Sequence, residues 1–242
     1  MSQIVLSKHV DTVIASSGGV GSSMLLTHLS QYRQTNLPSD DDGVKHSPLP
    51  PMTKHPQARF VYIFGDPRLA TLSLFRRNYQ HGHSRKLQRY QENPTGPVPK
   101  GISLDAYVAV GQDRLGFETH FDNWLMHHQV HQTLFLRYEA VHDNLDVLAT
   151  FLELPKQAIA TFPKRKERQS ALSRVAAPTR QGLERLYGPF AARLAALDDV
   201  IIKERVDIKT MMRCYQTEAY QRAIRWQIRN TRSIQSSQHN DH

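Results

Sequence analysis

Glycine and serine dominate one short segment of the chain, and this composition is suited to binding an anion. Residues 16–23 contain three glycines and four serines, in the order Ser16, Ser17, Gly18, Gly19, Val20, Gly21, Ser22, Ser23. Glycines let the backbone adopt positive φ and approach a bound group closely. Serine hydroxyls add hydrogen-bond donors, and free backbone N–H groups at the start of a helix attract phosphate. The segment therefore predicts a phosphate-binding loop that includes residues 17–23.

The elements on either side place this loop where α/β proteins bind ligands. Residues 10–15 are rich in β-branched side chains and predict a strand. After the loop, Met24, Leu25 and Leu29 lie at helical spacing and predict an amphipathic helix that begins near Ser22 or Ser23. A loop at the carboxyl end of the first strand lies at the edge of the sheet where such folds hold nucleotides.

The loop does not follow the pattern of ATP and GTP hydrolases. Those proteins carry a Gly-Lys-Ser/Thr sequence whose lysine contacts the β- and γ-phosphates. Here Ser22 follows Gly21, and no basic residue occurs from Ala15 to Thr27. The sequence argues against a nucleoside triphosphatase.

Two further short apolar runs, residues 60–64 and 133–136, predict strands buried on both faces. Asp66 followed by Pro67 is typical of a helix start. Short buried strands that alternate with helices predict an α/β fold with three layers, α/β/α, and a central parallel sheet of about five strands. We expect a single domain over residues 1–231, with long exposed loops at 34–57 and 80–103. A disordered polar tail is expected at 232–242.

The charge of the chain is concentrated near its C-terminus. The 242 residues carry 31 Lys and Arg against 22 Asp and Glu, which gives a net charge of +9. Residues 1–163 contribute 15 basic and 14 acidic side chains, and residues 164–242 contribute 16 and 8. A basic C-terminal third suggests a polyanionic partner such as a nucleotide phosphate, an acidic glycan or nucleic acid.

Other features of the composition indicate a cytoplasmic protein. The single cysteine, Cys214, excludes a disulfide framework and a thiolate metal cluster. No stretch approaches the ~18 apolar residues of a membrane span, and the N-terminus lacks the apolar core of a secretory signal.

Three segments resemble the PAPS-dependent sulfotransferases, which share the P-loop scaffold. The first is the loop, residues 19–23. The second is residues 61–77, which is similar to the strand and helix that hold the 3′-phosphate in that family. The third is residues 134–141 with the helix end at 151–154, which is similar to a leucine-rich strand followed by Arg-Tyr-Glu. Together they cover about two thirds of the chain.

The resemblance implies a transferase that moves a sulfuryl group from 3′-phosphoadenosine-5′-phosphosulfate (PAPS) to a hydroxyl or amine of an acceptor, for example a carbohydrate or small molecule. It implies that Ser73 binds the 3′-phosphate and that residues 17–23 bind the phosphosulfate. Two cations of the family are replaced here, by Gly19 and Gly65. Arg68, Arg76, Arg77 and the basic run 164–168, which includes Arg165, are the candidates to substitute for them.

A base that accepts the proton of the acceptor is also expected, and the candidates are His81, His83, Glu118 and His120. No metal is expected, because His127 and His131, although spaced i,i+4, have no third ligand and no His-Glu-x-x-His arrangement.

Two other functions remain open. Loss of the two cations is consistent with a sulfotransferase-like protein that binds a nucleotide or another anion without catalysis. The basic C-terminal third is consistent with a nucleic-acid partner, but aromatic residues do not alternate with the basic run at 164–168, so stacking surfaces for bases are not evident.

Overall fold

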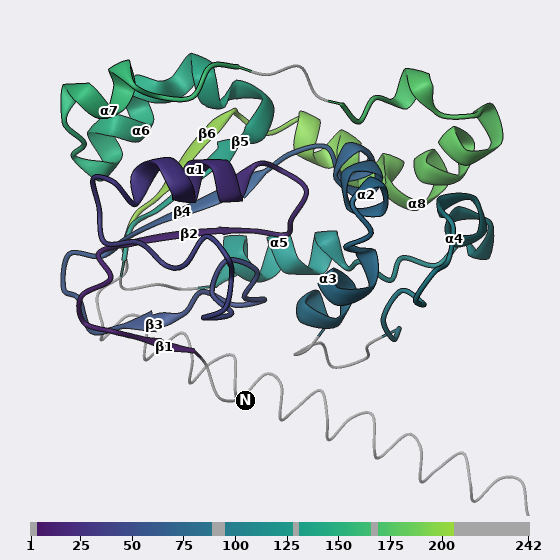
Figure 1. The fold of residues 1–242 in the computed structure, drawn as a ribbon, viewed down its shortest axis with the longest axis horizontal. Coiled ribbons are helices and arrows are strands. Elements are labelled where there is room, and N and C mark those ends of the chain that lie inside the picture. Colours follow the sequence, from purple (N-terminus) through teal and green to yellow (C-terminus); the bar gives the residue numbers. More distant parts are fainter. Residues whose placement is uncertain (1–3, 89–94, 128–130, 166–168, 206–242) are drawn as a thin grey trace, which may run out of the picture. The chain divides into compact units, whose positions relative to one another are not determined.

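A four-stranded sheet organises the part of the chain that the structure describes. The structure is a computed structural model, and it describes residues 4–88, 95–127, 131–165 and 169–205. The strand order is β2 (Thr12–Ser16), β4 (Arg59–Phe64), β5 (Thr133–Arg137) and β6 (Val200–Lys203) (Figure 1). The first three strands are parallel and β6 is antiparallel. A separate parallel pair joins β1 (Val5–Leu6) to β3 (Met52–Thr53).

Helices account for most of the remaining elements. They are α1 (Ser22–Leu29), α2 (Pro67–Arg76), α3 (Gln80–Leu87), α4 (Leu104–Val110), α5 (Phe117–Met126), α6 (Leu145–Leu152), α7 (Lys156–Ala160) and α8 (Ala177–Ala195), with 3-10 turns η1 (Tyr138–Asn144) and η2 (Leu172–Arg174). None of the helices in the described ranges combines the length and apolarity that crossing a bilayer requires.

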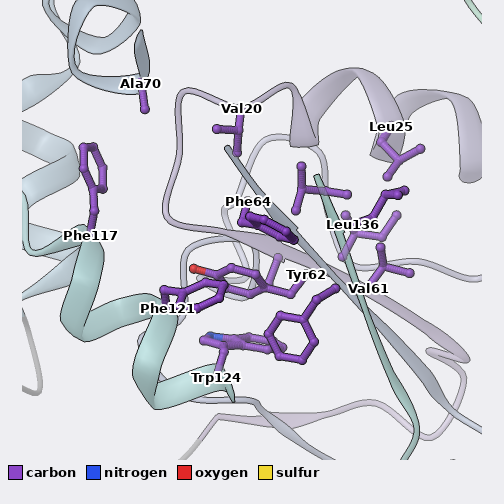
Figure 2. Packing of buried hydrophobic residues seen from close by; sticks show 14 of the residues in the cluster. Val20, Leu25, Val61, Tyr62, Phe64, Ala70, Phe117, Phe121, Trp124 and Leu136 are labelled. Atoms are coloured by element: carbon purple, nitrogen blue, oxygen red, sulfur yellow. The ribbon is translucent and has the colours of Figure 1, made fainter. Parts of the chain in front are cut away.

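The sheet is covered on both faces, as the continuous apolar runs predict. Helix α1 lies over one face and α5 over the other (Figure 1). Figure 2 shows Tyr62 on the same side as Trp124 of α5, whereas Val61 points toward Leu25 of α1. All four side chains are at most 2% exposed. The α/β class and the layered arrangement of helices on a sheet of parallel strands are therefore confirmed.

The prediction of an all-parallel central sheet is wrong in one strand. About five parallel strands were expected in that sheet; within the described residues it has four, and β6 runs antiparallel. The end of α8 is fixed at the carboxyl end of β5, because the Arg137 guanidinium donates to the carbonyls of Leu194 and Leu197 and its backbone N–H donates to the Asp199 carbonyl at 2.8 Å. The chain therefore enters β6 at the end where β5 finishes, and it has to run in the opposite direction.

The segment 34–57 is not the exposed loop that we predicted. Asn36, Val44, Lys45 and Ser47 are each at most 6% exposed. Trp124 of α5 donates its indole N–H to the Ser47 carbonyl at 2.8 Å, which holds the segment against the core. Its prolines and acidic residues gave no indication of this burial.

The predicted loop 80–103 is also corrected, because residues 80–87 form α3. This helix buries His83, Ser84 and Leu87, and Ser84 Oγ accepts the Val98 N–H at 2.9 Å. Residues 89–94 and the predicted tail 232–242 lie outside the described residues.

Asn36 completes the hydrogen bonding of β2 on the side away from β4. Its amide oxygen accepts the Ile14 N–H at 2.8 Å, and its amide nitrogen donates to the Ile14 carbonyl at 3.1 Å. The side chain is 2% exposed, so no solvent can replace these bonds.

Replacing Asn36 with alanine is expected to lower the free energy of unfolding by about 2–4 kcal/mol, because two buried backbone groups lose their partners. Urea unfolding followed by circular dichroism measures this change. Gln34→Ala, two residues earlier at an exposed position, is the control and is expected to change stability by less than about 0.5 kcal/mol. Equal losses in the two variants would contradict the role of Asn36.

Candidate functional site

The glycine loop is a tight turn between β2 and α1. Gly18, Gly19 and Gly21 all have positive φ, at 95°, 74° and 73°. A Cβ on Gly18 would lie 1.9 Å from the ring of His83, and one on Gly19 would lie 2.8 Å from the backbone of Ala70. A Cβ on Gly21 would lie 2.3 Å from the ring of Tyr138. The loop therefore contacts α2, α3 and η1 so closely that only glycine fits at these three positions.

Serine hydroxyls fix the base of the loop. Ser16 Oγ donates to Ser22 Oγ at 2.9 Å and accepts the Gly18 N–H at 3.2 Å. Ser16 and Ser22 are buried, whereas Ser23 is exposed. Ser22 and Ser23 occupy the first two positions of α1, where backbone N–H groups have no partner within the helix. Polar donors are thus concentrated at this helix start. Among them, the Ser23 residue is exposed to solvent.

Lys45 brings a positive charge to this helix start. Its ammonium donates to Ser23 Oγ at 3.1 Å and also to the Pro38 carbonyl. Burial lowers the pKa of Lys45, and the Asp40 carboxylate opposes that effect. A bound anion would favour the charged form of the ammonium in the same way. The sequence analysis missed this cation because it placed Lys45 in an exposed loop.

Two further basic residues act on the same region. Lys86 of α3 pairs with the buried carboxylate of Asp40. The charges of Lys86 and Arg77 both disfavour protonation of Lys45 and of His83, so all these groups lie within electrostatic range of one another. The area beside the loop therefore combines three cations with Asp40 and Asp42.

Helix α2 brings Ser73 and Arg77 to the side of the loop. Ala70 of α2 lies against Gly19 of the loop. Ser73 and Arg77 follow Ala70 by three and seven residues, so the three positions lie on one face of the helix and its C-terminal extension. Arg77 follows the last residue of α2, and its Nε donates to the Ser73 carbonyl at 3.0 Å. The loop therefore contacts the face of α2 that also carries position 73, one turn further along the helix.

Other predicted cations are not assembled at the loop. Arg68 pairs with Asp66 at 2.8 Å and with Glu184 at 2.6 Å, and these carboxylates raise its pKa. Arg165 pairs with Asp143 at 2.6 Å. Both arginines are therefore engaged by carboxylates.

At Gly65, where the sulfotransferases that the sequence resembles have an arginine, the nearest group is acidic. A Cβ on Gly65 would lie 3.0 Å from a carboxylate oxygen of Glu139 and 3.2 Å from Val20. Glu139 thus lies beside Gly65, at the position where the resemblance implies a cation.

The four candidate bases fall into two groups. His83 and His120 lie near the loop: His83 Nε2 is 2.9 Å from the Ser17 carbonyl, and His120 Nδ1 is 2.8 Å from the Tyr62 hydroxyl. His81 instead bonds the Val98 carbonyl at 2.7 Å. Glu118 pairs with Arg193 of α8 at 3.2 Å. Within the described ranges, the side chains of His81 and Glu118 are thus bonded to Val98 and Arg193 rather than to the loop.

His46 is a candidate base that the sequence analysis missed. Its Nδ1 lies 2.8 Å from the Ser16 carbonyl, and its ring packs edge-on against His83 with centroids 4.2 Å apart. Because a carbonyl only accepts, Nδ1 carries the hydrogen and Nε2 keeps a lone pair. Burial, followed by the charge of His83, lowers the pKa of His46 well below its usual value, so the ring is neutral near pH 7. Adjacent Lys45 and His46 thus present a cation and a neutral base beside the loop.

These buried imidazoles predict a fold that acid destabilises. Burial lowers the pKa of His83 to about 4 and that of His120 to about 3, whereas histidine in an unfolded chain titrates at about 6.5. From about pH 6.5 down to pH 4 the unfolded chain binds protons that the folded chain does not bind. The free energy of unfolding therefore falls as the pH falls, by up to about 1.4 kcal/mol per pH unit for each histidine.

Urea unfolding at a series of pH values between about 7.5 and 4.5 measures this slope. His120→Asn is expected to reduce the slope by about one histidine's contribution, and His9→Gln, at an exposed position, is the control. Identical slopes in the wild type and in His120→Asn would show that the buried ring is not responsible.

No cluster of three or more His, Cys, Asp or Glu side chains suited to a metal ion occurs among the residues that the structure describes. His131, one member of the i,i+4 pair, is instead stacked on Phe60 with ring centroids 5.4 Å apart.

No model of a known protein family matches the chain, and no curated protein sequence matches it. The interpretation of the site therefore depends on its own geometry and chemistry.

Proposed function

We propose that this protein is a sulfotransferase that uses PAPS as its donor and a hydroxyl- or amine-bearing acceptor. The observation that carries the proposal is the Lys45 ammonium, 3.1 Å from Ser23 Oγ at the start of α1 and next to the three-glycine turn. This arrangement supplies the cation that the loop sequence lacks at Gly19. The acceptor would attack the sulfur of the donor's sulfuryl group. The bond from that sulfur to the phosphate oxygen would break, and the phosphate would leave with the nucleotide.

The residues around the turn suit the charge that develops on a departing phosphate. Backbone N–H groups of Ser22 and Ser23 and the ammonium of Lys45 are positioned before any ligand arrives, and such fixed donors stabilise developing charge most effectively. The proposal assigns these three residues to the phosphosulfate end of the donor. It assigns Ser73 and Arg77, on the same side of α2 as the loop contact, to the 3′-phosphate end.

The acceptor must lose a proton as it attacks, and we assign this proton to His46. The ring is neutral near pH 7, and its Nε2 retains a lone pair because Nδ1 faces the Ser16 carbonyl. His46 as a residue is partly exposed, whereas His83 and His120 are buried. We therefore assign the acceptor proton to His46 rather than to the other two rings.

A nucleotide-binding protein without catalysis is the second candidate. It is favoured by the pairing of Arg68 and Arg165 with carboxylates and by the position of Glu139 beside Gly65. Because of these contacts, fewer cations are available for the 3′-phosphate of the nucleotide than in the sulfotransferases that the sequence resembles.

Consumption of PAPS separates the two functions without knowledge of the acceptor. Purified protein is incubated with PAPS labelled on the sulfuryl group, with water or a panel of sugars, phenols and amines as acceptors, and the release of adenosine 3′,5′-bisphosphate is measured. The transferase predicts release that exceeds the protein-free rate and depends on His46, so that His46→Gln reduces it about 10²-fold or more. Binding of PAPS with no release above the protein-free rate would support the second candidate.

A further inference from the structure

A pocket of about 570 Å³ lies beside α2, between that helix, the start of α4 and residues 169–175. Its apolar lining includes Leu72, Phe75, Ile102 and Leu104. This volume is in the range that holds a small organic molecule.

The pocket and the glycine loop lie on opposite faces of α2. At 100° per residue, the pocket residues Leu72, Phe75 and Arg76 point away from Ala70, which touches Gly19. No residue from 16 to 23 lines the pocket, and neither does Ser73 or Arg77. The pocket is therefore separate from the proposed donor site.

The polar groups of the pocket indicate the chemistry of its ligand. Arg76 is in the lining, and no aspartate or glutamate occurs among the lining residues that the structure describes. Arg76 donates to the neutral side chain of Gln169 at 2.6 Å, so this hydrogen bond leaves its charge uncompensated. The charge of Arg76 at the wall of an otherwise apolar pocket favours an anion.

Two buried polar atoms add a second indication. Gln80 Oε1 and Ser170 Oγ have no hydrogen-bond partner among the described residues, and their residues are 3% and 7% exposed. Both residues line the pocket. Leaving such atoms unpaired costs about 1–3 kcal/mol each, a cost that a ligand with a hydrogen-bonding group would remove.

We propose that this pocket binds a small organic anion with an apolar body, about the size of two fused rings, at a site distinct from the donor site. The apolar body would contact Leu72, Phe75 and Leu104, and its anionic group would lie toward Arg76. This inference does not depend on the proposed transferase activity.

Calorimetric titration with 2-naphthoate tests the proposal, with the uncharged 2-naphthamide as the matched probe. We expect one naphthoate per chain with a dissociation constant of about 100 µM, and at least about tenfold weaker binding of the amide. Arg76→Gln is expected to weaken naphthoate binding about tenfold or more. Arg85→Gln, an exposed position of α3 outside the lining, is expected to leave it unchanged.

A steric variant and a competition experiment complete the test. Leu104→Trp is expected to fill part of the pocket and to weaken binding at least about tenfold, and near-wild-type far-UV circular dichroism establishes that the variant is folded. Adenosine 3′,5′-bisphosphate is expected not to displace naphthoate. Displacement by that nucleotide, equal affinity for naphthoate and its amide, or unchanged binding by a folded Leu104→Trp protein would each overturn the proposal. Failure of the nucleotide to bind at all would count against the proposed transferase alone.

Discussion

Replacing Lys45 with methionine is expected to lower the rate of sulfuryl transfer about 10²–10³-fold, the usual cost of removing one preorganised donor from a transition state. The ammonium of Lys45 lies 3.1 Å from Ser23 Oγ, at the helix start where we place the departing phosphate. Methionine keeps most of the length and the apolar contacts of the side chain and removes the charge together with the hydrogen bonds to Ser23 Oγ and the Pro38 carbonyl. The measurement is the rate at which adenosine 3′,5′-bisphosphate is released from PAPS.

The control for this experiment is Lys54→Met. Lys54 belongs to the same segment, 34–57, but is exposed, unlike the buried Lys45. The Lys54→Met substitution removes the same net charge as Lys45→Met. A general electrostatic effect would therefore lower the transfer rates of the two variants equally. A rate for Lys45→Met within about threefold of the Lys54→Met rate would show that Lys45 is not the cation of the loop.

Replacing Gly19 with alanine is expected to destabilise the fold by about 2–4 kcal/mol and to abolish nucleotide binding. The added Cβ would lie 2.8 Å from both the Cα and the carbonyl oxygen of Ala70. These are backbone atoms of α2, so they cannot move aside as a flexible side chain would. The loop must shift, and its N–H groups would shift with it. Urea unfolding and calorimetric titration with adenosine 3′,5′-bisphosphate measure the two effects.

Gly111→Ala separates steric contact from backbone strain. Gly111 has φ 69°, close to the 74° of Gly19, but a Cβ at this position would meet nothing within 4 Å. Gly111→Ala therefore adds only the strain of a left-handed backbone at an alanine, which lowers the free energy of unfolding by about 1–2 kcal/mol. This variant is expected to bind nucleotide as the wild type does. Equal destabilisation by the two substitutions would mean that the contact between the loop and α2 contributes nothing.

Local patterns in the sequence were sufficient to predict the loop and its neighbours. The β-branched run, the three glycines and the apolar spacing of Leu25 and Leu29 each act within a few residues. The structure has the strand, turn and helix in that order, with positive φ at all three glycines. Asp66 also caps α2 as predicted, since its side chain accepts the Arg68 N–H at 2.8 Å.

The position of Lys45 could not be predicted in this way. Its burial follows from contacts made far along the chain, such as the bond from Trp124 to the Ser47 carbonyl and the bonds between Asn36 and Ile14. Prolines and aspartates in the segment suggested solvent exposure. Only tertiary packing shows that the segment passes the start of α1.

The charge count likewise could not show which arginines are available. Arg68 and Arg165 matched the expected cation positions by sequence, but each pairs with a carboxylate, and the partner Glu184 lies 116 residues from Arg68.

The strand β6 was also missed in the sequence. Its residues form a short segment after α8, and the contacts of Arg137 set the direction of that segment.

Calorimetric titration of the full chain with adenosine 3′,5′-bisphosphate, compared with unphosphorylated adenosine, tests the site most directly. If the glycine turn, Lys45 and the Ser73 face of α2 together hold a doubly phosphorylated nucleotide, one equivalent binds at low micromolar concentration, about 10²-fold more tightly than adenosine, and more weakly as salt is added. The same heat for both compounds, or none for either, would contradict an anion site at the start of α1.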